Sequence, residues 1–426
     1  MIAFASVTLL LLVILFAGLP VAFSLGTTSI FLIYLYELPM KIVANTIFTS
    51  LDSFVVIAIP LFVLMSQVLL DGKVGDDLFE VMNAWVRHLP GGLGIATILA
   101  CAFFAAISGS GAATAATIGM VAYPAMMARG YEKRFILGLL ACGGTLGILI
   151  PPSIPLIIYG AVTEESIGKL FMAGVIPGVV LTTILVLFAV YRSQRGGYIR
   201  MEPASWTERI RVTRRNLPGI ALPFLILGGI YTGAFTPTEA AAIGLVYSLA
   251  VTMFFYRTLT LRDLPRVCLK AVRTSCMIAM IIGGAILFGR VMTLLEIPQR
   301  LTGLIIDWKL SVLMFVMAMN VLMLALGCIL ETVSIILLTM PLVAPILGAL
   351  GIDPIWYAIV LTVNMEMALV TPPVGMNLYV ISGLDKDIHM ADVIRGVTPF
   401  IILLACFLVL TMLFPPMSTW LPSMMK

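Results

Sequence analysis

Charge and histidine are both scarce in this sequence of 426 residues. Only 11% of the residues are Asp, Glu, Lys or Arg, whereas 61% are hydrophobic and the mean hydropathy is +1.13. A soluble domain needs a charged surface, so the composition predicts that most of the chain faces lipid or packs inside a membrane bundle. The net charge of +4 does not indicate a nucleic-acid partner, because the basic residues lie in short loops between apolar runs.

The few histidines and cysteines exclude several classes of protein. His88 and His389 are the only histidines, and both lie in predicted loops far from any candidate nucleophile. The segment Ser108-Gly-Ser-Gly111 could suggest the serine of an intramembrane protease, but a serine without its base is a weak motif. The six cysteines lie in apolar stretches without CxxC spacing, which favours packing over metal binding or disulfides. The sequence therefore predicts a protein that is not an enzyme.

Apolar runs of membrane length dominate the chain. We expect about ten spans of roughly 20 residues, at 2–17, 20–36, 51–71, 135–165, 172–193, 217–232, 238–256, 274–296, 355–384 and 397–414. No basic segment precedes the first run, which is typical of an uncleaved first span and not of a signal peptide. Two further pairs of apolar segments are too short to cross, at roughly 20 to 22 Å of helix against a hydrocarbon core of about 30 Å. We predict that each pair, 93–107 with 115–128 and 312–326 with 335–347, is a re-entrant hairpin.

Two double prolines interrupt predicted spans, at Pro151-Pro152 and at Pro372-Pro373. Proline has no backbone N–H, so each pair should leave two upstream helical carbonyls without a partner. The carbonyls concerned belong to Gly147, Ile148, Ala368 and Leu369. Unwound backbone is tolerated at membrane depth only where protein buries it or where it lines a cavity, and free carbonyl oxygens bind hard cations. The two breaks therefore predict an ion-coupled transporter.

The two halves of the chain repeat the same features in the same order. Pro20 pairs with Pro237, Pro124 with Pro341 and Pro151 with Pro372. Five spans in each half are an odd number, so the second half should be inverted in the membrane. With both termini outside, 19 of the 25 Lys and Arg residues fall on the inner side of the membrane, in agreement with the positive-inside rule.

The fold class that follows is an all-α integral membrane protein built as an inverted repeat of two five-span halves. Each half holds a re-entrant hairpin and a proline-broken helix. The repeat divides the chain into segments 1–71, 166–216 (with a polar cytoplasmic linker at 194–216), 217–296 and 387–426, and into segments 72–165 and 297–386. Each of the last two segments holds an arm, a hairpin and a broken helix.

The hairpin tips carry the candidate chemistry. Glycines at the first tip permit a sharp turn and a close approach to bare amides, while Ser108, Ser110 and Thr114 offer hydroxyls; the alternative is a Gly/Ser motif for helix packing. Glu331 is ionisable at the second tip, where a charge is costly, so a functional role is the default hypothesis. Glu366, within a predicted span, could instead form a buried ion pair.

These residues together resemble the large membrane subunit of the tripartite ATP-independent periplasmic (TRAP) transporters, and the resemblance covers essentially the whole chain. It rests on Leu51-Asp-Ser-Phe54 with Ile59-Pro-Leu-Phe62, Ser108-Gly-Ser-Gly111, Ile150-Pro-Pro-Ser153, Gly233-Ala-Phe-Thr-Pro-Thr-Glu-Ala240 and Thr371-Pro-Pro-Val-Gly375. The resemblance implies a sodium-driven importer of an organic acid, such as a C4-dicarboxylate or sialic acid, in the bacterial inner membrane. It also implies an elevator mechanism, in which residues 72–165 and 297–386 form a transport domain that slides against a scaffold of residues 1–71, 166–216, 217–296 and 387–426. The resemblance further implies a separate small four-helix membrane subunit, for which this chain has no room, and a periplasmic substrate-binding protein.

The site residues follow from the tips, the breaks and this resemblance. Helix N-termini at 153–155 and 375–377, and those after Gly111 and Glu331, should favour a carboxylate. We expect substrate contacts from Ser108, Ser153 and Asn377. We expect sodium, the only coupling ion, to be held by Ser110, Gly111, Gly147, Ile148, Pro151, Gly327, Glu331, Thr332, Ala368, Leu369, Thr371 and Gly375.

Two alternatives remain open at this point. A stand-alone sodium/anion symporter of similar architecture would need no partner subunits. A scaffolding membrane subunit would have no ion site of its own, although paired breaks that face re-entrant tips argue against it.

Overall fold

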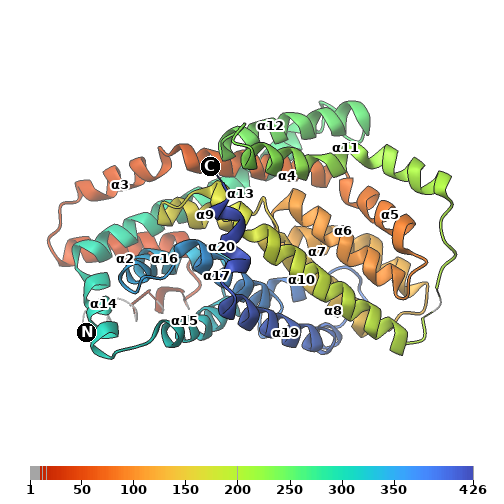
Figure 1. Cartoon of the computed structure of the whole chain (residues 1–426). Coiled ribbons are helices and arrows are strands. Elements are labelled where there is room, and N and C mark those ends of the chain that lie inside the picture. Colours follow the sequence, from red (N-terminus) through yellow and green to blue (C-terminus); the bar gives the residue numbers. More distant parts are fainter. Residues whose placement is uncertain (1–9, 12, 16, 199, 426) are drawn as a thin grey trace.

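The structure is a computed structural model that describes residues 10–11, 13–15, 17–198 and 200–425, and every regular element in this part of the chain is a helix (Figure 1). The first half contains α2 (Val21–Leu35), α3 (Lys41–Leu51), α4 (Phe54–Asp71), α5 (Val74–Val86), α6 (Gly92–Ser108), α7 (Gly111–Met127), α8 (Lys133–Leu149), α9 (Ile154–Thr163) and α10 (Ile167–Arg195). The second half contains α11 (Trp206–Tyr231), α12 (Pro237–Ala250), a π-helical turn (Val251–Phe255), α13 (Leu264–Leu294), α14 (Ile297–Asp307), α15 (Val312–Gly327), α16 (Thr332–Ala349), α17 (Pro354–Leu369), α18 (Met376–Ser382), α19 (Met390–Leu413) and α20 (Pro416–Ser423).

Within the described residues, seven helical segments are long and apolar enough to cross a membrane. Six match predicted spans: Phe54–Asp71, Lys133–Thr163, Ile167–Arg195, Pro237–Phe255, Leu264–Leu294 and Met390–Leu413. The seventh, Thr332–Ala349, was predicted as a hairpin arm at 335–347. It is longer than expected because the helix begins directly after Glu331 and continues through Pro341 and Pro345. The predicted span at 2–17 lies mostly outside the described residues.

Both predicted hairpins and both broken helices are present in the structure. The helix pairs α6–α7 and α15–α16 form the hairpins, and α8–α9 and α17–α18 form the broken helices. The two halves contact each other at these elements: α7 of the first hairpin packs against α18, and α16 of the second hairpin packs against α9. The hairpin of each half therefore contacts the broken helix of the other half.

Helix α13 is the centre of a second group of helices, in which it packs against α2, α3 and α4. Gly284 permits one of these close contacts, since a Cβ at this position would lie 2.8 Å from the carbonyl oxygen of Ala22. The predicted span at 274–296 covers only part of this element, because one continuous helix begins at Leu264. Helix α13 also packs against α16, so it joins this group to the second hairpin.

Helix α19 packs closely against α8, where the backbones meet at Gly138 and Gly396. Residues 387–426 were predicted to belong to the scaffold and α8 to the transport domain. The assignment of these residues to one moving unit or the other stays a prediction.

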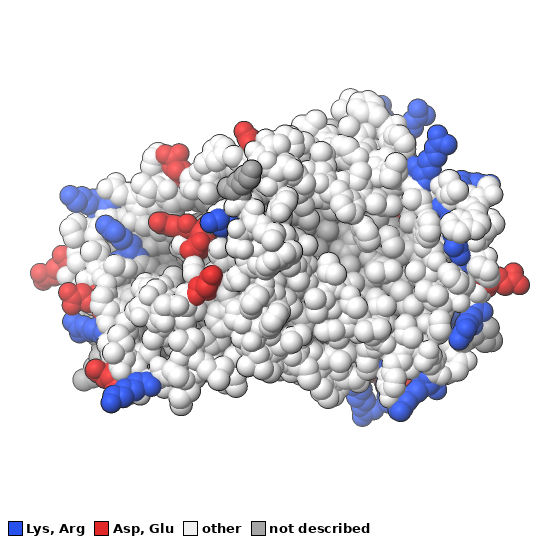
Figure 2. Space-filling model, in the orientation of Figure 1, with Lys and Arg blue, Asp and Glu red and all other residues white. Residues whose placement is uncertain are grey.

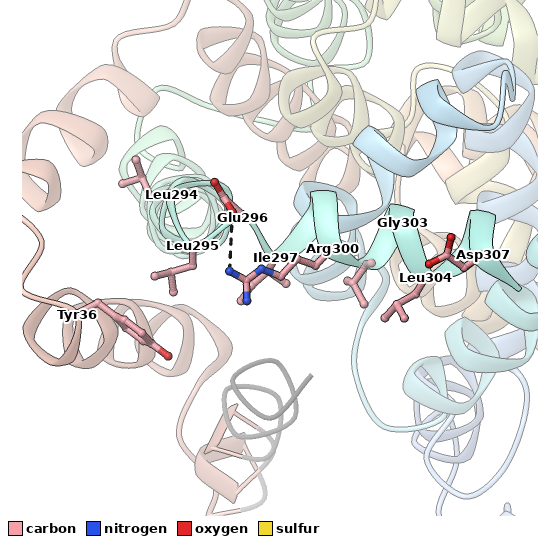
Figure 3. Close-up of a pocket in the computed structure, with 10 residues that line it drawn as sticks. Tyr36, Leu294, Leu295, Glu296, Ile297, Arg300, Gly303, Leu304 and Asp307 are labelled. Atoms are coloured by element: carbon pink, nitrogen blue, oxygen red, sulfur yellow. Dashed lines mark ion pairs between the residues drawn. The ribbon is translucent and has the colours of Figure 1, made fainter.

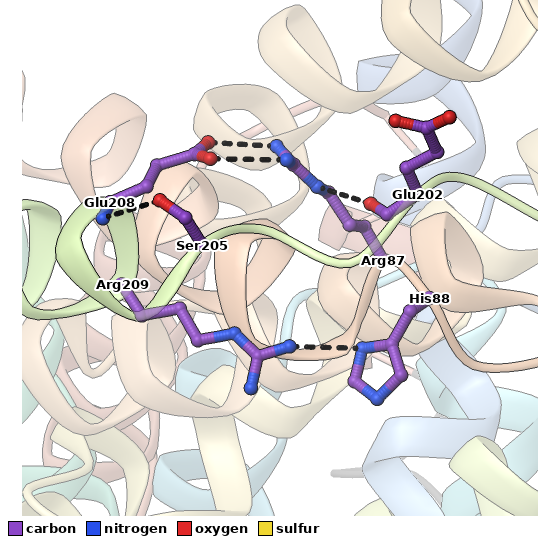
Figure 4. A network of polar contacts seen from close by, with 6 residues as sticks. All are labelled: Arg87, His88, Glu202, Ser205, Glu208 and Arg209. Carbon is purple, nitrogen blue, oxygen red and sulfur yellow. Dashed lines mark hydrogen bonds and ion pairs between the residues drawn. The ribbon is translucent and has the colours of Figure 1, made fainter.

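The amphipathic helix α5 is held to the start of α11 by a polar network (Figure 4). The guanidinium of Arg87 donates to both carboxylate oxygens of Glu208, at 2.8 and 3.1 Å, and to the carbonyl of Glu202 at 2.9 Å. The predicted linker at 194–216 is shorter than expected, because α10 continues to Arg195 and α11 begins at Trp206. The Ser205 hydroxyl caps α11 by accepting a hydrogen bond from the Glu208 amide.

Charged side chains lie at the two ends of the molecule, and the middle of the visible face is almost free of them (Figure 2). Lys and Arg dominate the end where α10 finishes and α11 begins, whereas acidic and basic groups are mixed at the opposite end (Figures 1 and 2). An uncharged band between two charged ends is what a membrane-embedded bundle requires.

Candidate functional site

The tip of the first hairpin is a tight turn between α6 and α7. Gly109, with a φ of 61° in the left-handed region, ends α6 after Ser108 and reverses the chain. The hydroxyls of Ser108 and Thr114 lie 2.9 Å apart, and the Thr114 hydroxyl donates to the Ser110 carbonyl at 2.9 Å. The hydroxyls that the sequence placed at this tip therefore hold the turn together.

The first helix break, at Pro151-Pro152, is closed by a side chain. The hydroxyl of Ser153 donates a hydrogen bond to the carbonyl of Ile148 at 2.5 Å. The expectation that this carbonyl is free is wrong, because a serine hydroxyl can replace the amide that proline lacks. No donor among the described residues replaces the missing amide at the Gly147 carbonyl.

The second break, at Pro372-Pro373, has a similar arrangement with different donors. The amide of Thr371 donates to the carbonyl of Ala368 at 3.1 Å, so this carbonyl is not free either and the expectation is wrong here too. The Thr371 hydroxyl donates to the Met367 carbonyl at 2.6 Å. For the Leu369 carbonyl, as for Gly147, no donor is found in the described part of the chain.

One backbone hydrogen bond joins each hairpin tip to the break in its own half. In the first half, the Ile154 amide donates to the Gly109 carbonyl at 3.4 Å; in the second half, the Val374 amide donates to the Cys328 carbonyl at 3.1 Å. These bonds occupy corresponding positions of the internal repeat. The two halves therefore build the same tip-to-break unit.

A cavity of about 140 Å³ lies where the tips, the breaks and α13 meet. It is lined by Gly109, Ser110, Gly111, Ala112, Ile148, Ile154, Pro155, Thr274, Met277, Ile278, Glu331, Thr332, Val333, Leu369 and Met376. Six of these are residues predicted to bind sodium, namely Ser110, Gly111, Ile148, Glu331, Thr332 and Leu369. The structure thus brings residues from both halves into one cavity.

Four helices begin at this cavity. The first residues of α7, α9, α16 and α18 all line it: Gly111, Ile154, Thr332 and Met376. These are the helix ends that the sequence predicted to favour a carboxylate, and the structure brings them to one place. Helix N-termini carry unpaired amides and partial positive charge, so their convergence favours an anion. Glu331 is the only ionisable side chain among the lining residues, and it offers a negative charge for a cation.

The three predicted substrate residues do not line the cavity. Ser108 and Ser153 are 3% and 0% exposed, and their hydroxyls make the internal hydrogen bonds described above. Asn377 is fully buried, and its Nδ2 donates to the Ala141 carbonyl at 2.9 Å. Its Oδ1 has no partner within the described residues. In this conformation these side chains support the cavity walls, and substrate would reach them only after a rearrangement.

The other predicted sodium residues lie outside the cavity lining: Gly147, Pro151, Gly327, Ala368, Thr371 and Gly375. Two of these glycines permit close packing. A Cβ on Gly147 would lie 2.5 Å from the Ser110 carbonyl oxygen, and a Cβ on Gly327 would overlap the side chain of Ala368. The glycines therefore allow each hairpin to approach the broken helix beside it.

Sequence reasoning missed the contribution of α13 to the cavity. Thr274, Met277 and Ile278 line one side, but no motif marks them in the sequence. The buried ion pair that was one alternative for Glu366 is not formed within the described residues. Its side chain is fully buried, and neither carboxylate oxygen has a hydrogen-bond partner there. Glu366 lies on α17 one turn before Leu369, which lines the cavity.

A larger pocket of about 590 Å³ lies between the ends of α2 and α13 and the side of α14 (Figure 3). Its lining includes Glu296, Arg300 and Asp307, and Arg300 points toward Glu296 with a separation of 3.8 Å. The side chains of Arg300 and Glu296 are 65% and 71% exposed, so this ion pair contributes little to the stability of the fold. No residue of a tip or a break lines the pocket. The smaller cavity is therefore the better candidate site.

Comparisons with known proteins agree with this architecture. The family model described as "Tripartite ATP-independent periplasmic transporter, DctM component" matches residues 8–417. The chain is 40% identical to the C4-dicarboxylate TRAP transporter large permease protein DctM of Rhodobacter capsulatus, over 98% of each protein. It is 33% identical to the sialic acid TRAP transporter large permease protein SiaM of Vibrio cholerae, over 96% of each protein.

A solved structure shares the fold. The crystal structure of the Alcanivorax borkumensis YdaH transporter matches with a TM-score of 0.62, over 87% of this chain and 88% of that one, at 14% sequence identity. At this identity the likeness concerns the fold alone.

Proposed function

Because the chain belongs to the family of DctM components of tripartite ATP-independent periplasmic transporters, we propose that it imports an organic acid together with sodium. The observation that carries the proposal is the cavity at which four helix N-termini converge beside one carboxylate, Glu331. The helix ends favour the carboxylate of a substrate, and Glu331 and the Leu369 carbonyl favour a cation. Binding both charges together lowers the cost of carrying either one through the membrane.

We propose a C4-dicarboxylate as the preferred class of substrate. The relatives that are 40% and 41% identical to this chain are named for C4-dicarboxylates, whereas the sialic acid relative is 33% identical. The cavity of about 140 Å³ is smaller than a usual ligand site of roughly 300 to 1,000 Å³. Loading therefore requires the tips to move away from α13, and the substrate would then reach Ser108, Ser153 and Asn377.

The motion that we propose is an elevator. The hairpins and broken helices would slide as a transport domain against a scaffold built around α13. The position of the cavity supports this division, because α13 contributes one wall and the two tip-to-break units contribute the rest. We further propose that a separate small membrane subunit and a periplasmic substrate-binding protein complete the transporter in the bacterial inner membrane, with both termini of this chain in the periplasm.

Reconstituted transport tests this function directly. The purified chain would be placed in proteoliposomes with and without the small subunit and the binding protein, and uptake of a radiolabelled C4-dicarboxylate would be followed. We expect uptake only with all three components and an inward sodium gradient, with a dependence on sodium steeper than first order. Full uptake with choline in place of sodium would refute sodium coupling. Full uptake by this chain alone would favour the stand-alone symporter.

A further inference from the structure

A shallow groove of about 560 Å³ lies on the outer face of α11, away from the candidate site. It is lined by Trp206, Thr207, Ile210, Arg211, Arg214, Arg215 and Phe255. All but Phe255 come from the first turns of α11, where residues three and four apart share one helix face. Trp206 and Phe255 are 67% and 62% exposed. The groove therefore combines arginines and large apolar side chains on one open surface.

The basic residues of α11 are divided between two environments. Arg209 turns toward α5, where its guanidinium stacks over the rings of Trp85 and Trp206 and lies 3.5 Å from the His88 ring (Figure 4). Arg211 and Arg214 are exposed, and neither forms an ion pair within the described part of the chain. These two guanidinium groups are available to a ligand.

Arg215 has an acidic neighbour of its own. Burial raises the pKa of the Asp77 carboxyl on α5, and the positive charge of Arg215 partly opposes that shift. Arg215 therefore lines the groove and also interacts with the protein. A test of the groove should change Arg211 and Arg214 and leave Arg215 in place.

The groove lies where the chain passes from a charged end into an apolar span. Arg211, Arg214 and Arg215 precede the apolar stretch of α11, and Figure 2 shows that Lys and Arg gather at this end of the molecule. Large aromatic side chains beside basic ones are typical of the boundary between lipid headgroups and hydrocarbon. A ligand at this boundary meets guanidinium groups on the water side and apolar surface on the other.

We propose that this groove binds the phosphate headgroup of an anionic phospholipid. Arginine suits a phosphate because its planar guanidinium can donate two parallel hydrogen bonds to phosphate oxygens. The acyl chains would cover Ile210 and Phe255, which free phosphate would leave exposed to water. The lipid would also lie against the same helix that holds α5 through Glu208, so the headgroup would help to fix the junction of α5 and α11. The proposal does not depend on the substrate or on sodium coupling.

Native mass spectrometry of the purified full chain tests this proposal. Phosphatidylglycerol and phosphatidylcholine would be titrated separately onto delipidated protein, and the dissociation constant of the first bound lipid would be measured. The test variant is Arg211→Gln/Arg214→Gln. The matched control is Arg129→Gln/Lys386→Gln, which removes two exposed basic residues outside the groove. Arg211→Lys/Arg214→Lys keeps the charge and is a second test should the Gln variant fold poorly.

We expect wild-type protein to bind phosphatidylglycerol more tightly than phosphatidylcholine. A basic residue near an anionic lipid contributes about fivefold in affinity, so the Gln variant, which lacks two, should bind phosphatidylglycerol about 25-fold more weakly. The Lys variant should fall between wild type and the Gln variant, and the control should stay close to wild type. An equal loss in control and test variants, or no loss in the Gln and Lys variants, would overturn the proposal.

Two further outcomes identify a different ligand. If the soluble headgroup glycerophosphoglycerol displaces the lipid at the same concentration as the intact lipid, the groove is a site for free phosphate esters and the lipid proposal fails. Cysteines introduced at positions 211 and 214 would test for contact with a small membrane subunit by cross-linking. If they cross-link to it and the complex no longer binds phosphatidylglycerol, the groove is a protein contact and the proposal also fails.

Discussion

The hydroxyl of Ser153 replaces the amide that proline removes from the first broken helix, by donating to the carbonyl of Ile148 at 2.5 Å. Both groups are buried, and Ile148 also lines the cavity. A helix can therefore be broken at membrane depth without leaving every carbonyl unpaired. The Ser153 side chain then has a structural role in addition to the substrate contact that the sequence suggested.

We expect Ser153→Ala to lower the free energy of unfolding by about 1 to 3 kcal/mol, because it leaves a buried carbonyl unpaired. Sodium should recover part of this loss, since the freed Ile148 carbonyl lies at the cavity. The measurement is thermal unfolding in detergent, in sodium chloride and in choline chloride. Ser423→Ala is the control, because its hydroxyl makes a similar bond to the Trp420 carbonyl at 2.7 Å on the surface. Equal stability of Ser153→Ala and wild type would contradict this prediction.

Removing the charge of Glu331 should change the response to sodium more than the response to substrate. Glu331 is the only ionisable side chain among the cavity-lining residues, and like charges repel, so it should not contact a substrate carboxylate directly. We expect Glu331→Gln to raise the sodium concentration for half-maximal uptake several-fold, the result of losing on the order of 1 kcal/mol of attraction. Initial uptake would be measured against sodium and against substrate.

The control for this comparison is Glu164→Gln, which removes an exposed carboxylate in the loop between α9 and α10. It should leave both responses unchanged. A change in the apparent substrate affinity alone for Glu331→Gln would assign this residue to substrate binding instead.

The sequence predicts the hairpins and breaks well because their causes are local. Gly109 at the first tip and Pro151-Pro152 at the first break constrain the backbone wherever they occur. The hydroxyl of Ser153 was also foreseeable, since serine competes for nearby backbone groups. The cavity wall that Thr274 forms could not be predicted from the sequence, because it depends on how α13 packs against the second hairpin. An apolar helix carries no signal for which of its faces will meet a cavity.

The orientation of the chain is tested by chemical labelling. We expect the segment between α10 and α11 to lie in the cytoplasm and the loop before α12 to lie in the periplasm, as the distribution of Lys and Arg requires. Glu202→Cys and Ala234→Cys each introduce a thiol at an exposed position in these two segments. On a background without the six native cysteines, a membrane-impermeant maleimide added to intact spheroplasts should label only the second. Labelling of residue 202 under these conditions would reverse the topology.

Gly147 should be intolerant of even a methyl group, because α8 approaches the first tip backbone to backbone. A Cβ at this position would lie 2.5 Å from the Ser110 carbonyl oxygen and 2.8 Å from the Gly111 nitrogen, and neither atom is on a flexible side chain. We expect Gly147→Ala to cost about 1 to 3 kcal/mol of stability through overpacking and to weaken sodium-dependent uptake, because the tip must shift away from the break.

Gly228→Ala is the matched control on α11, where a Cβ has nothing within 4 Å. It should be neutral or should stabilise the protein by up to about 1 kcal/mol, since alanine restricts the unfolded chain. The stability of both variants would be measured by thermal unfolding, and their transport by initial uptake rates. Normal sodium-dependent uptake by Gly147→Ala would show that close contact of this tip with the break is not needed for transport.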